Sequence, residues 1–487
     1  MKRRRALKNL GLSFSAGIAL PVLPGLLGSC KEADPGPEIR YDGIVAVIGA
    51  GAAGLYAADF LKSKGVNIKI FEASDRVGGR IRSMRLSNDS PVKTDFPIEL
   101  GAERILGTNS LWAEIIDQLN VPVIDLSSTA TDNYILDKIF REGASVQSDA
   151  DFAAAKNFLD NLSAYAGDNV SVLQAIQSAG LNPRMYAILN SWIGNKHGTS
   201  NSHLSAKGLA EALTLLSRNK MERLLRSNPM QDVLASRFNA VIPSVEFSTA
   251  IKTIDYSSSK IKLLCEKIHA DGSTENISME ADKVIVTVPV SILKTAGINF
   301  IPSLPAPKTI SISHLDMDPC IRMVLDFKQN FWGEHSGFLY GGDEFPEYFN
   351  TGVARSQFNK TLSITISGEQ AQKISNLGVD GAIQSVLKEL DIVFAGKASL
   401  NIRKDDAGKI ANEYFDWTKQ PYIKGGISYL KPGGTISDRT ELAEPINRSL
   451  FFAGEATDNT GESGTVNGAL LSAKRAAQEV VEAILNP

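Results

Sequence analysis

The chain has 487 residues, of which 43% are hydrophobic and 22% are charged, and its formal net charge at pH 7 is −3. This is ordinary globular composition, and the length predicts about two to three domains. The slightly acidic balance gives no basis for a nucleic-acid partner. Three cysteines are too few for a disulfide framework, and five scattered histidines without ligand spacing predict no metal site.

The first thirty residues have the layout of an export signal. A basic start precedes a mostly apolar stretch from Leu10 to Leu27. Arg4-Arg5-x-Leu7-Lys8 resembles a twin-arginine signal, and Leu27-Gly28-Ser29-Cys30 resembles a bacterial lipobox, whose cysteine is lipidated. We therefore expect an export signal with lipobox Cys30 over residues 1–30 and a linker over residues 31–42.

This layout predicts an exported bacterial lipoprotein of the periplasm or cell envelope, which meets the membrane only through its lipid anchor. An N-terminal membrane helix is the alternative. Two prolines inside the apolar stretch disfavour it.

A glycine turn follows the first predicted strand of the domain. The apolar run Ile44 to Ile48 predicts a buried parallel strand. Gly49 then permits a tight turn, Gly51 lets the backbone approach a pyrophosphate, and Gly54 lets a helix pack on the strand. This order predicts a dinucleotide-binding unit.

The rest of that unit is present in the next residues. Leu55 to Lys64 has apolar residues at helical spacing, and the N-terminus of such a helix attracts phosphate. Ile68 to Phe71 predicts a second strand, and Glu72 at its end can accept hydrogen bonds from a ribose.

The next motif distinguishes between FAD and NAD as the predicted cofactor. It is Arg76-Val77-Gly78-Gly79-Arg80. Its glycines allow the backbone to lie against a ligand, and Arg80 supplies a cation for pyrophosphate or flavin oxygens. The stretch from Glu72 to Arg80 resembles the first motif of the flavin-containing amine oxidase family, E-A-x-x-R-x-G-G-R, at every fixed position. The resemblance implies FAD as the cofactor.

The C-terminal part of the chain resembles the same family. Phe452 to Glu455, Gly464 to Ala469 and Ser472 to Ala477 repeat its order F-A-G-E, G-x-V-x-G-A and S-x-x-R-A-A. In the family the glutamate binds the FAD chain, and the helix that begins here lies under the flavin ring. The positive end of that helix would stabilise negative charge on the reduced flavin.

The segments between these ends agree with the resemblance. Strands are expected over Phe247 to Ile254 and Ala281 to Pro289. Helices are expected from apolar residues at three-to-four spacing over Leu111 to Leu119, Ala150 to Tyr165, Val170 to Ala179 and Ser205 to Leu225.

The expected fold is therefore α/β: an FAD-binding, Rossmann-like domain of the two-dinucleotide-binding type with an interleaved α+β substrate domain. The FAD-binding domain would comprise residues 43–110, 235–300 and 415–487, and the substrate domain residues 111–234 and 301–414. The resemblance implies a set of cofactor-binding residues: Gly49, Gly51, Ala53, Gly54, Glu72, Ala73, Gly79, Arg80, Gly101, Ala102, Ile251, Gly454, Glu455, Thr465 and Val466.

Three positions depart from the family. The family's lysine, which holds a water against the flavin and assists reaction with oxygen, is Arg322 here, and arginine is not a conservative replacement. The electron acceptor is therefore either O2 or a quinone or protein carrier. The aromatic pair that contacts the amine is replaced by Ile427 and Thr465, and the flavin-linking cysteine by Gly426. FAD is thus expected to be non-covalent.

Arg104 suggests a more specific substrate. It follows Glu99-Leu100-Gly101-Ala102-Glu103, and L-amino-acid oxidases have an arginine there that binds the substrate carboxylate. An ion pair with Glu103 and a surface position are the alternatives. Arg322 is the candidate catalytic residue, and Arg104, Ile427 and Thr465 are candidate substrate contacts.

The expected function is oxidation of a small-molecule amine or L-amino acid to an imine by hydride transfer to flavin N5. A carotenoid- or porphyrinogen-type flavin dehydrogenase shares the first motif and is one alternative. A lipoprotein that binds FAD without turnover is another.

Overall fold

The computed structural model describes residues 39–84, 91–355 and 359–486. The predicted export signal with Cys30, and most of the predicted linker, lie outside these ranges. Within them, no helix is long and apolar enough to cross a membrane. Residues 37–487 form one unit, which contains all of the described ranges.

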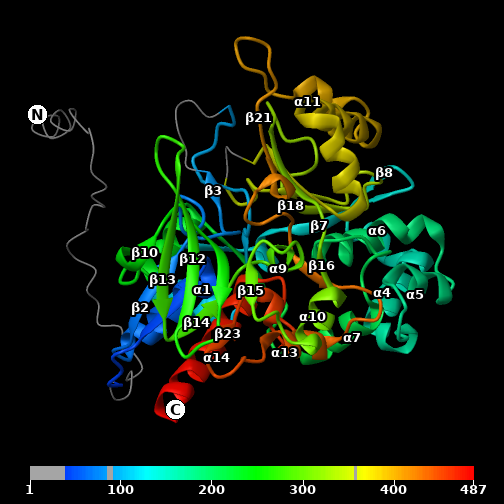
Figure 1. Cartoon of the computed structure of the whole chain (residues 1–487). Coiled ribbons are helices and arrows are strands. Elements are labelled where there is room, and N and C mark those ends of the chain that lie inside the picture. Colours follow the sequence, from blue (N-terminus) through cyan, green and yellow to red (C-terminus); the bar gives the residue numbers. More distant parts are fainter. Residues whose placement is uncertain (1–38, 85–90, 356–358, 487) are drawn as a thin grey trace, which may run out of the picture. The chain divides into compact units, whose positions relative to one another are not determined.

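Five parallel strands form the sheet that carries the glycine turn (Figure 1). Its order is β10, Val245–Glu246; β2, Asn67–Phe71; β1, Ile44–Ile48; β14, Lys283–Val286; and β23, Leu450–Phe452. The last strand of the chain therefore joins the sheet that the first one begins. The central strands are almost wholly apolar because other elements cover both faces.

Two helices from opposite ends of the chain share one core on this sheet. They are α1, Ala52–Ser63, and α14, Val466–Leu485, and Leu55, Leu61 and Leu470 lie buried in that core. The predicted helices at both ends of the chain are confirmed. The last one begins two residues after Gly464.

A second sheet packs on the other face of the first. Its antiparallel order is β13, Thr274–Ala281; β12, Ile261–Ile268; and β11, Thr249–Asp255, beside the short parallel strand β15, Asn299–Ile301. Residues of both sheets form one core. The strand expected at 247–254 is confirmed within two residues.

The third large sheet has seven strands: β21, Asn412–Asp416; β17, Cys320–Asp326; β20, Thr361–Ser367; β19, Glu347–Asn350; β18, Ser336–Tyr340; β7, Thr131–Leu136; and β8, Ile139–Arg141. The helical segment α11, Gly368–Val393, packs on one face and is interrupted at Gly378, whose φ is +69°. In register across the sheet, Arg322 pairs with Thr365, Thr365 with Glu347, and Glu347 with Tyr340.

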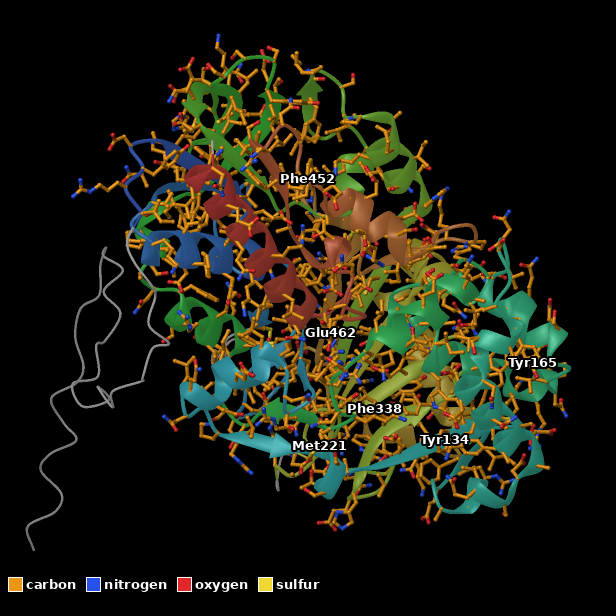
Figure 2. The ribbon with its side chains drawn as sticks, turned by 90° about the horizontal axis from the view of Figure 1, so that it is seen from below. Tyr134, Tyr165, Met221, Phe338, Phe452 and Glu462 are labelled. Atoms are coloured by element: carbon orange, nitrogen blue, oxygen red, sulfur yellow. The ribbon has the colours of Figure 1, made fainter. Side chains whose placement is uncertain are left out.

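The helical region contains α2, Leu111–Gln118; α4, Ala150–Asp160; α5, Val172–Ser178; α6, Tyr186–Trp192; and α7, Ala206–Leu215. Helices α4, α5 and α7, teal to green in Figure 1, lie away from β12 and β13. Figure 2 shows Tyr165 at the outer side of these helices and Phe452 among the strands of the other half.

One predicted helix was too long. Residues 205–225 carry helical spacing, but α7 ends at Leu215 and β9, Glu222–Leu225, is a strand. This strand pairs with β5, Arg104–Leu106, and β6, Val123–Asp125. Pairing with strands distant in sequence overrode the local pattern, which sequence periodicity cannot show.

β7 and β8, from the first predicted insert of the substrate domain, join strands of the second insert in the seven-stranded sheet, whereas β5, from the predicted FAD-binding range, pairs with β9 of the first insert. The boundaries themselves stay a prediction, and β21 spans the one proposed at 415.

Candidate functional site

A cavity of about 1240 Å³ lies between the glycine turn, the start of α14 and the seven-stranded sheet. It brings together nearly all of the predicted site residues. Those in its wall are Gly49, Gly51, Ala53, Glu72, Ala73, Gly79, Arg80, Gly101, Ala102, Arg104, Ile251, Arg322, Ile427, Gly454, Glu455, Thr465 and Val466. Gly54 is the one predicted residue that does not line it.

The three glycines of the turn differ in the space around them. Gly49 has a φ of +108°, which favours glycine. A Cβ on Gly51 would meet no atom within 4 Å, so this position opens into the cavity, whereas a Cβ on Gly54 would lie 1.8 Å from the Gly49 carbonyl oxygen. Gly54 therefore serves packing, and Gly51 leaves room for a ligand.

Glu72 is buried at the end of β2, beside the turn. Its carboxylate accepts hydrogen bonds from the Ala50 N–H at 2.7 Å and from the Ser74 N–H and hydroxyl at 2.9 and 2.6 Å. These donors hold the side chain in the cavity wall, where it can meet a ribose.

A partly buried ion pair joins the two ends of the chain at the cavity. Arg80 Nη1 donates to Glu455 Oε1 at 2.6 Å and to the Gly426 carbonyl at 3.0 Å. Glu455 also accepts from the Gly464 N–H at 2.9 Å. Burial opposes ionisation of Glu455, but Arg80 and Arg439 outweigh it and hold its pKa below the ordinary value.

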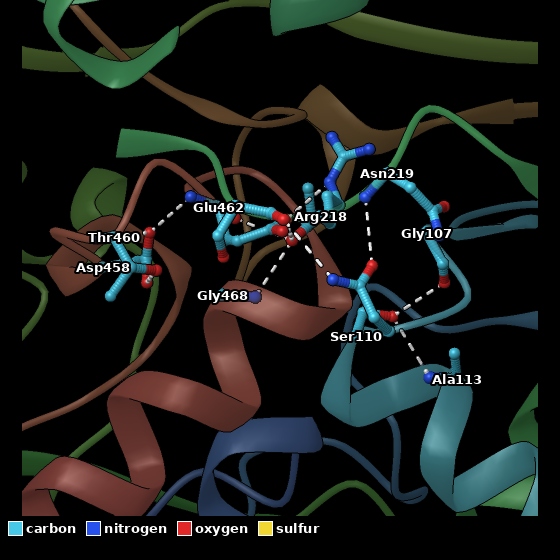
Figure 3. A network of polar contacts seen from close by, with 12 residues as sticks. Gly107, Ser110, Ala113, Arg218, Asn219, Asp458, Thr460, Glu462 and Gly468 are labelled. Carbon is cyan, nitrogen blue, oxygen red and sulfur yellow. Dashed lines mark hydrogen bonds and ion pairs between the residues drawn. The ribbon is translucent and has the colours of Figure 1, made fainter. Parts of the chain in front are cut away.

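The helix α14 presents its N-terminus to the cavity. Thr465 caps it by accepting from the Gly468 N–H at 2.9 Å. The adjoining loop is fixed by the segment after α7, since Arg218 Nε lies 2.9 Å from Glu462 Oε2 (Figure 3). The site therefore depends on contacts between segments that the sequence separates by more than two hundred residues.

Arg322 lies in the cavity wall with only 6% of its surface exposed. One guanidinium nitrogen pairs with Glu103 and another donates to the Thr365 hydroxyl. The remaining Nε has no hydrogen-bond partner among the described residues. Arg322 therefore does not face bulk solvent.

Arg104 already has a carboxylate partner. Its Nη1 lies 3.1 Å from Glu222 Oε2, and its guanidinium lies 5.0 Å from the centre of the Phe338 ring. Burial would lower the pKa of Arg104, but Glu222 and Glu347 raise it above its ordinary value. Neither alternative expected for this residue applies, because Glu103 pairs with Arg322 and Arg104 is largely buried.

The positions that replace the aromatic pair and the linking cysteine meet at one side of the cavity. A Cβ on Gly426 would lie 2.6 Å from the Cβ of Cys320, and one on Gly464 would lie 2.4 Å from Ile427. The chain is tightly packed here, so a side chain at position 426 has no space.

Several cavity residues escaped the sequence interpretation. Arg439 is buried and donates to Ser428 and Ala456 behind Glu455. His197 donates from Nδ1 to the Ile193 carbonyl at 2.8 Å, and burial lowers its pKa to about 4. Glu347 and Lys196 also line the cavity. They lie on elements without a motif, and only the folded chain brings them to the site.

Among the described residues no group of three or more His, Cys, Asp or Glu side chains could hold a metal ion.

Comparison with known proteins identifies relatives of this arrangement. The model of the family described as flavin containing amine oxidoreductase matches residues 52–481. The chain is 24% identical to Lysine-specific histone demethylase 2 of Homo sapiens, covering 91% of this chain and 54% of that protein. It is also 24% identical to Lysine-specific histone demethylase 1 homolog 3 of Arabidopsis thaliana, covering 30% of that protein. The chain thus spans only part of the length of these relatives.

Solved structures share the fold. Putrescine oxidase bound to putrescine superimposes with a TM-score of 0.72 at 20% identity, covering 90% of this chain and 99% of the other. Cyclohexylamine oxidase from Brevibacterium oxydans has a TM-score of 0.73 at 19% identity, with 91% and 99% covered. The expected fold class, an FAD-binding Rossmann-like domain with a substrate domain, is confirmed.

Proposed function

Because the chain belongs to the flavin-containing amine oxidoreductase family, we propose that it oxidises a primary amine or an L-amino acid to an imine with FAD as its cofactor. The observation that carries the proposal is the single cavity lined by both the N-terminal glycine turn and the start of α14. FAD accepts the hydrogen of the carbon next to the amine as hydride.

The residues of the cavity fit FAD. The turn leaves open space at Gly51, and the N-terminus of α1 begins immediately after it, as a pyrophosphate requires. Glu72 would accept from the adenosine ribose, and Ile251, which lines the same cavity, would lie at the adenine end. Glu455 and Arg80 would hold the chain that carries the flavin, and the positive end of α14 would face the ring.

The protein's remaining task is to position the amine. The strip of seven-stranded sheet that faces the cavity carries Arg322 and Thr365, which are locked to each other and to Glu103. Such a rigid wall keeps the substrate carbon in place and excludes water, which is the contribution expected of a protein in flavin chemistry.

Two electron acceptors are considered for the reduced flavin. O2 is the acceptor expected of an amine oxidase, and a quinone or protein carrier is the second candidate. Arg322 favours the second, because its guanidinium is engaged by Glu103 and Thr365 and so is not a free compact cation.

The proposal is tested by anaerobic mixing of the yellow holoenzyme with primary amines and L-amino acids. Loss of flavin absorbance, followed by ammonia release once an acceptor is added, is the expected result. Flavin that stays oxidised with every amine, or that bleaches without ammonia, contradicts amine oxidation. Repeating the assay with O2, or with a quinone, as the only acceptor identifies the acceptor.

We also propose that the protein is exported and lipidated at Cys30. The support is the twin-arginine-like and lipobox-like order of residues 1–30. In a bacterial host, Cys30→Ala is expected to move the protein from the membrane fraction to the soluble fraction, and Arg4→Lys with Arg5→Lys to keep it inside the cell. Equal fractionation of all variants contradicts the proposal.

A further inference from the structure

His197 lines the cavity with one ring nitrogen engaged and the other free. It ends the short 3-10 helix η4, Asn195–His197, and its Nδ1 lies 2.8 Å from the Ile193 carbonyl oxygen. Because a carbonyl oxygen only accepts, Nδ1 carries the proton of the neutral ring, and Nε2 carries a lone pair. Among the described residues, Nε2 has no hydrogen-bond or ion-pair partner. The neutral ring therefore offers a ligand one free acceptor.

The surroundings of His197 keep its ring neutral. Burial lowers the pKa of His197 to about 4. The nearby cations Lys196, Arg439 and Arg218 act in the same direction, whereas the backbone hydrogen bond opposes them. A protonated ring would donate from Nε2, but the neutral ring can only accept there.

The segment that carries His197 bridges two walls of the cavity. Before it, Asn195 Nδ2 donates to the Thr365 carbonyl at 3.1 Å, on the strip of sheet that faces the cavity. After it, a Cβ on Gly198 would lie 2.6 Å from the Cβ of Ile427. His197 lies between these two contacts, so its ring lies beside a position expected to contact the amine.

The residues at the positions of the family's aromatic pair offer the amine no free acceptor. Ile427 is apolar. The Thr465 hydroxyl donates to the Glu462 carbonyl at 2.7 Å and accepts from the Gly468 N–H at 2.9 Å. An amine that enters this part of the cavity leaves water behind, so its N–H groups need a new acceptor. His197 supplies one.

We propose that His197 Nε2 accepts a hydrogen bond from the reacting nitrogen of the substrate, so that the protein selects amines that carry an N–H group. The inference rests on the proposed amine oxidation and names a specificity-determining residue for it. An acceptor suits this reaction, because the nitrogen lone pair must stay free to form the carbon–nitrogen double bond as the hydride leaves. A neutral tertiary amine has no N–H group and would leave Nε2 without a partner.

The test compares the affinity of the holoenzyme for matched amines with and without an N–H group. The pairs are benzylamine with N,N-dimethylbenzylamine and L-phenylalanine with N,N-dimethyl-L-phenylalanine, at about pH 10, where the neutral amines predominate. Apparent Kd is obtained from the concentration dependence of anaerobic flavin reduction, or from competition where a compound does not reduce the flavin. The measured quantity is the ratio of Kd, tertiary over primary.

Two variants of His197 separate the hydrogen bond from the shape of the side chain. We expect the unaltered protein to give a ratio of about ten or more for at least one pair, the effect of one buried hydrogen bond. His197→Leu removes the acceptor and should lower that ratio about tenfold by weakening the primary amine alone. His197→Gln keeps an acceptor, the side-chain carbonyl oxygen, and should retain most of the ratio. Unchanged flavin absorbance in both variants shows that each holds FAD.

A matched control is His203→Leu. His203 lies further along the same loop, but its Nδ1 pairs with Asp318 at 2.8 Å and it does not line the cavity. This variant also loses an imidazole from the loop, and it should keep the ratio of the unaltered protein.

Two results overturn the inference. One is a ratio near one in the unaltered protein, or a high ratio that His197→Leu leaves intact. The other is an equal loss of affinity for both members of a pair in His197→Leu, together with a shifted flavin absorbance, which would assign His197 to the cofactor. If no amine of any kind reduces the flavin, the proposed function fails instead, so the two failures are distinguishable.

Discussion

Two glycines three residues apart, Gly51 and Gly54, have opposite tolerance for a side chain. A Cβ at Gly51 points into empty space, whereas one at Gly54 would lie 1.8 Å from the Gly49 carbonyl oxygen. Gly51 therefore leaves space in the cavity, whereas Gly54, in the same motif, allows the helix to pack closely against the turn.

Gly51→Trp should leave a folded protein without flavin. The new side chain would start in open space, since a Cβ at this position meets no atom within 4 Å, and its indole would extend into the space expected for the pyrophosphate. The purified variant should lack the yellow flavin absorbance and keep its circular dichroism spectrum. Gly54→Ala is the contrasting change, because the clash with Gly49 should lower the yield of folded protein. A yellow Gly51→Trp protein contradicts the role of the turn.

Glu99 makes stability depend on pH. It accepts from the Ser83 hydroxyl at 2.6 Å and the Met230 N–H at 2.8 Å, and burial raises its pKa to about 7. Its unfolded pKa is about 4.3, so between these values the folded protein binds the extra proton and loses stability as pH rises, by up to about 4 kcal/mol.

Glu99→Gln removes this loss. Relative to the unaltered protein, the variant should gain stability between pH 5 and pH 7 and show no further relative change above pH 8. Thermal unfolding at a series of pH values measures the difference. Parallel curves for the two proteins would show that Glu99 does not titrate in this range.

The elements of the site are held by contacts between loops rather than by neighbouring strands alone. The segment between α7 and β9 supplies Arg218, and the loop before α14 supplies Glu462, which is 3% exposed (Figure 3). This pair joins the segment after α7 to the loop before α14, whose first residues line the cavity. Removal of this ion pair should therefore lower both the free energy of unfolding and the affinity for FAD.

Arg218→Ala should lower stability by about 3 kcal/mol, because it leaves the Glu462 carboxylate buried without its partner. It should also weaken FAD binding. Chemical unfolding and flavin release measure the two effects. Lys207→Ala, which breaks an exposed pair with Asp168 beside α7, is the control and should cost less than about 1 kcal/mol. Equal effects of the two variants contradict the role of the buried pair.

For the whole molecule, the important property is that both ends of the described chain build one cofactor site. β1 and β23 flank β14, and Arg80 reaches Glu455 across 375 positions of sequence. Binding of FAD therefore links folding of the two ends, and ligand binding should raise the unfolding temperature of the unit as a whole.

FAD should be released intact by denaturation. A cysteine at position 426 would collide with Cys320, whose Cβ lies 2.6 Å from the position of its own Cβ, and the native residue there is glycine. After acid precipitation, all flavin absorbance should appear in the supernatant. Yellow colour retained in the pellet after washing would show a covalent link through another residue.

The sequence alone determined the parts of this protein that depend on neighbouring residues. The glycine turn, Glu72, Arg80, Glu455 and the start of α14 lie in motifs, because each needs a fixed local backbone to meet the cofactor. The same holds for most strands and helices, whose periodicity reflects which face is buried.

Only the tertiary structure decided which distant strands and charged side chains pair with one another. Residues 222–225 became a strand because β5 and β6 lie beside them, and Arg104 found Glu222 rather than its neighbour Glu103. Glu347 faces the cavity because of its register with Thr365, which no local pattern encodes. This part of the cavity wall is built by such pairings between distant segments, because a sheet aligns side chains that the sequence separates.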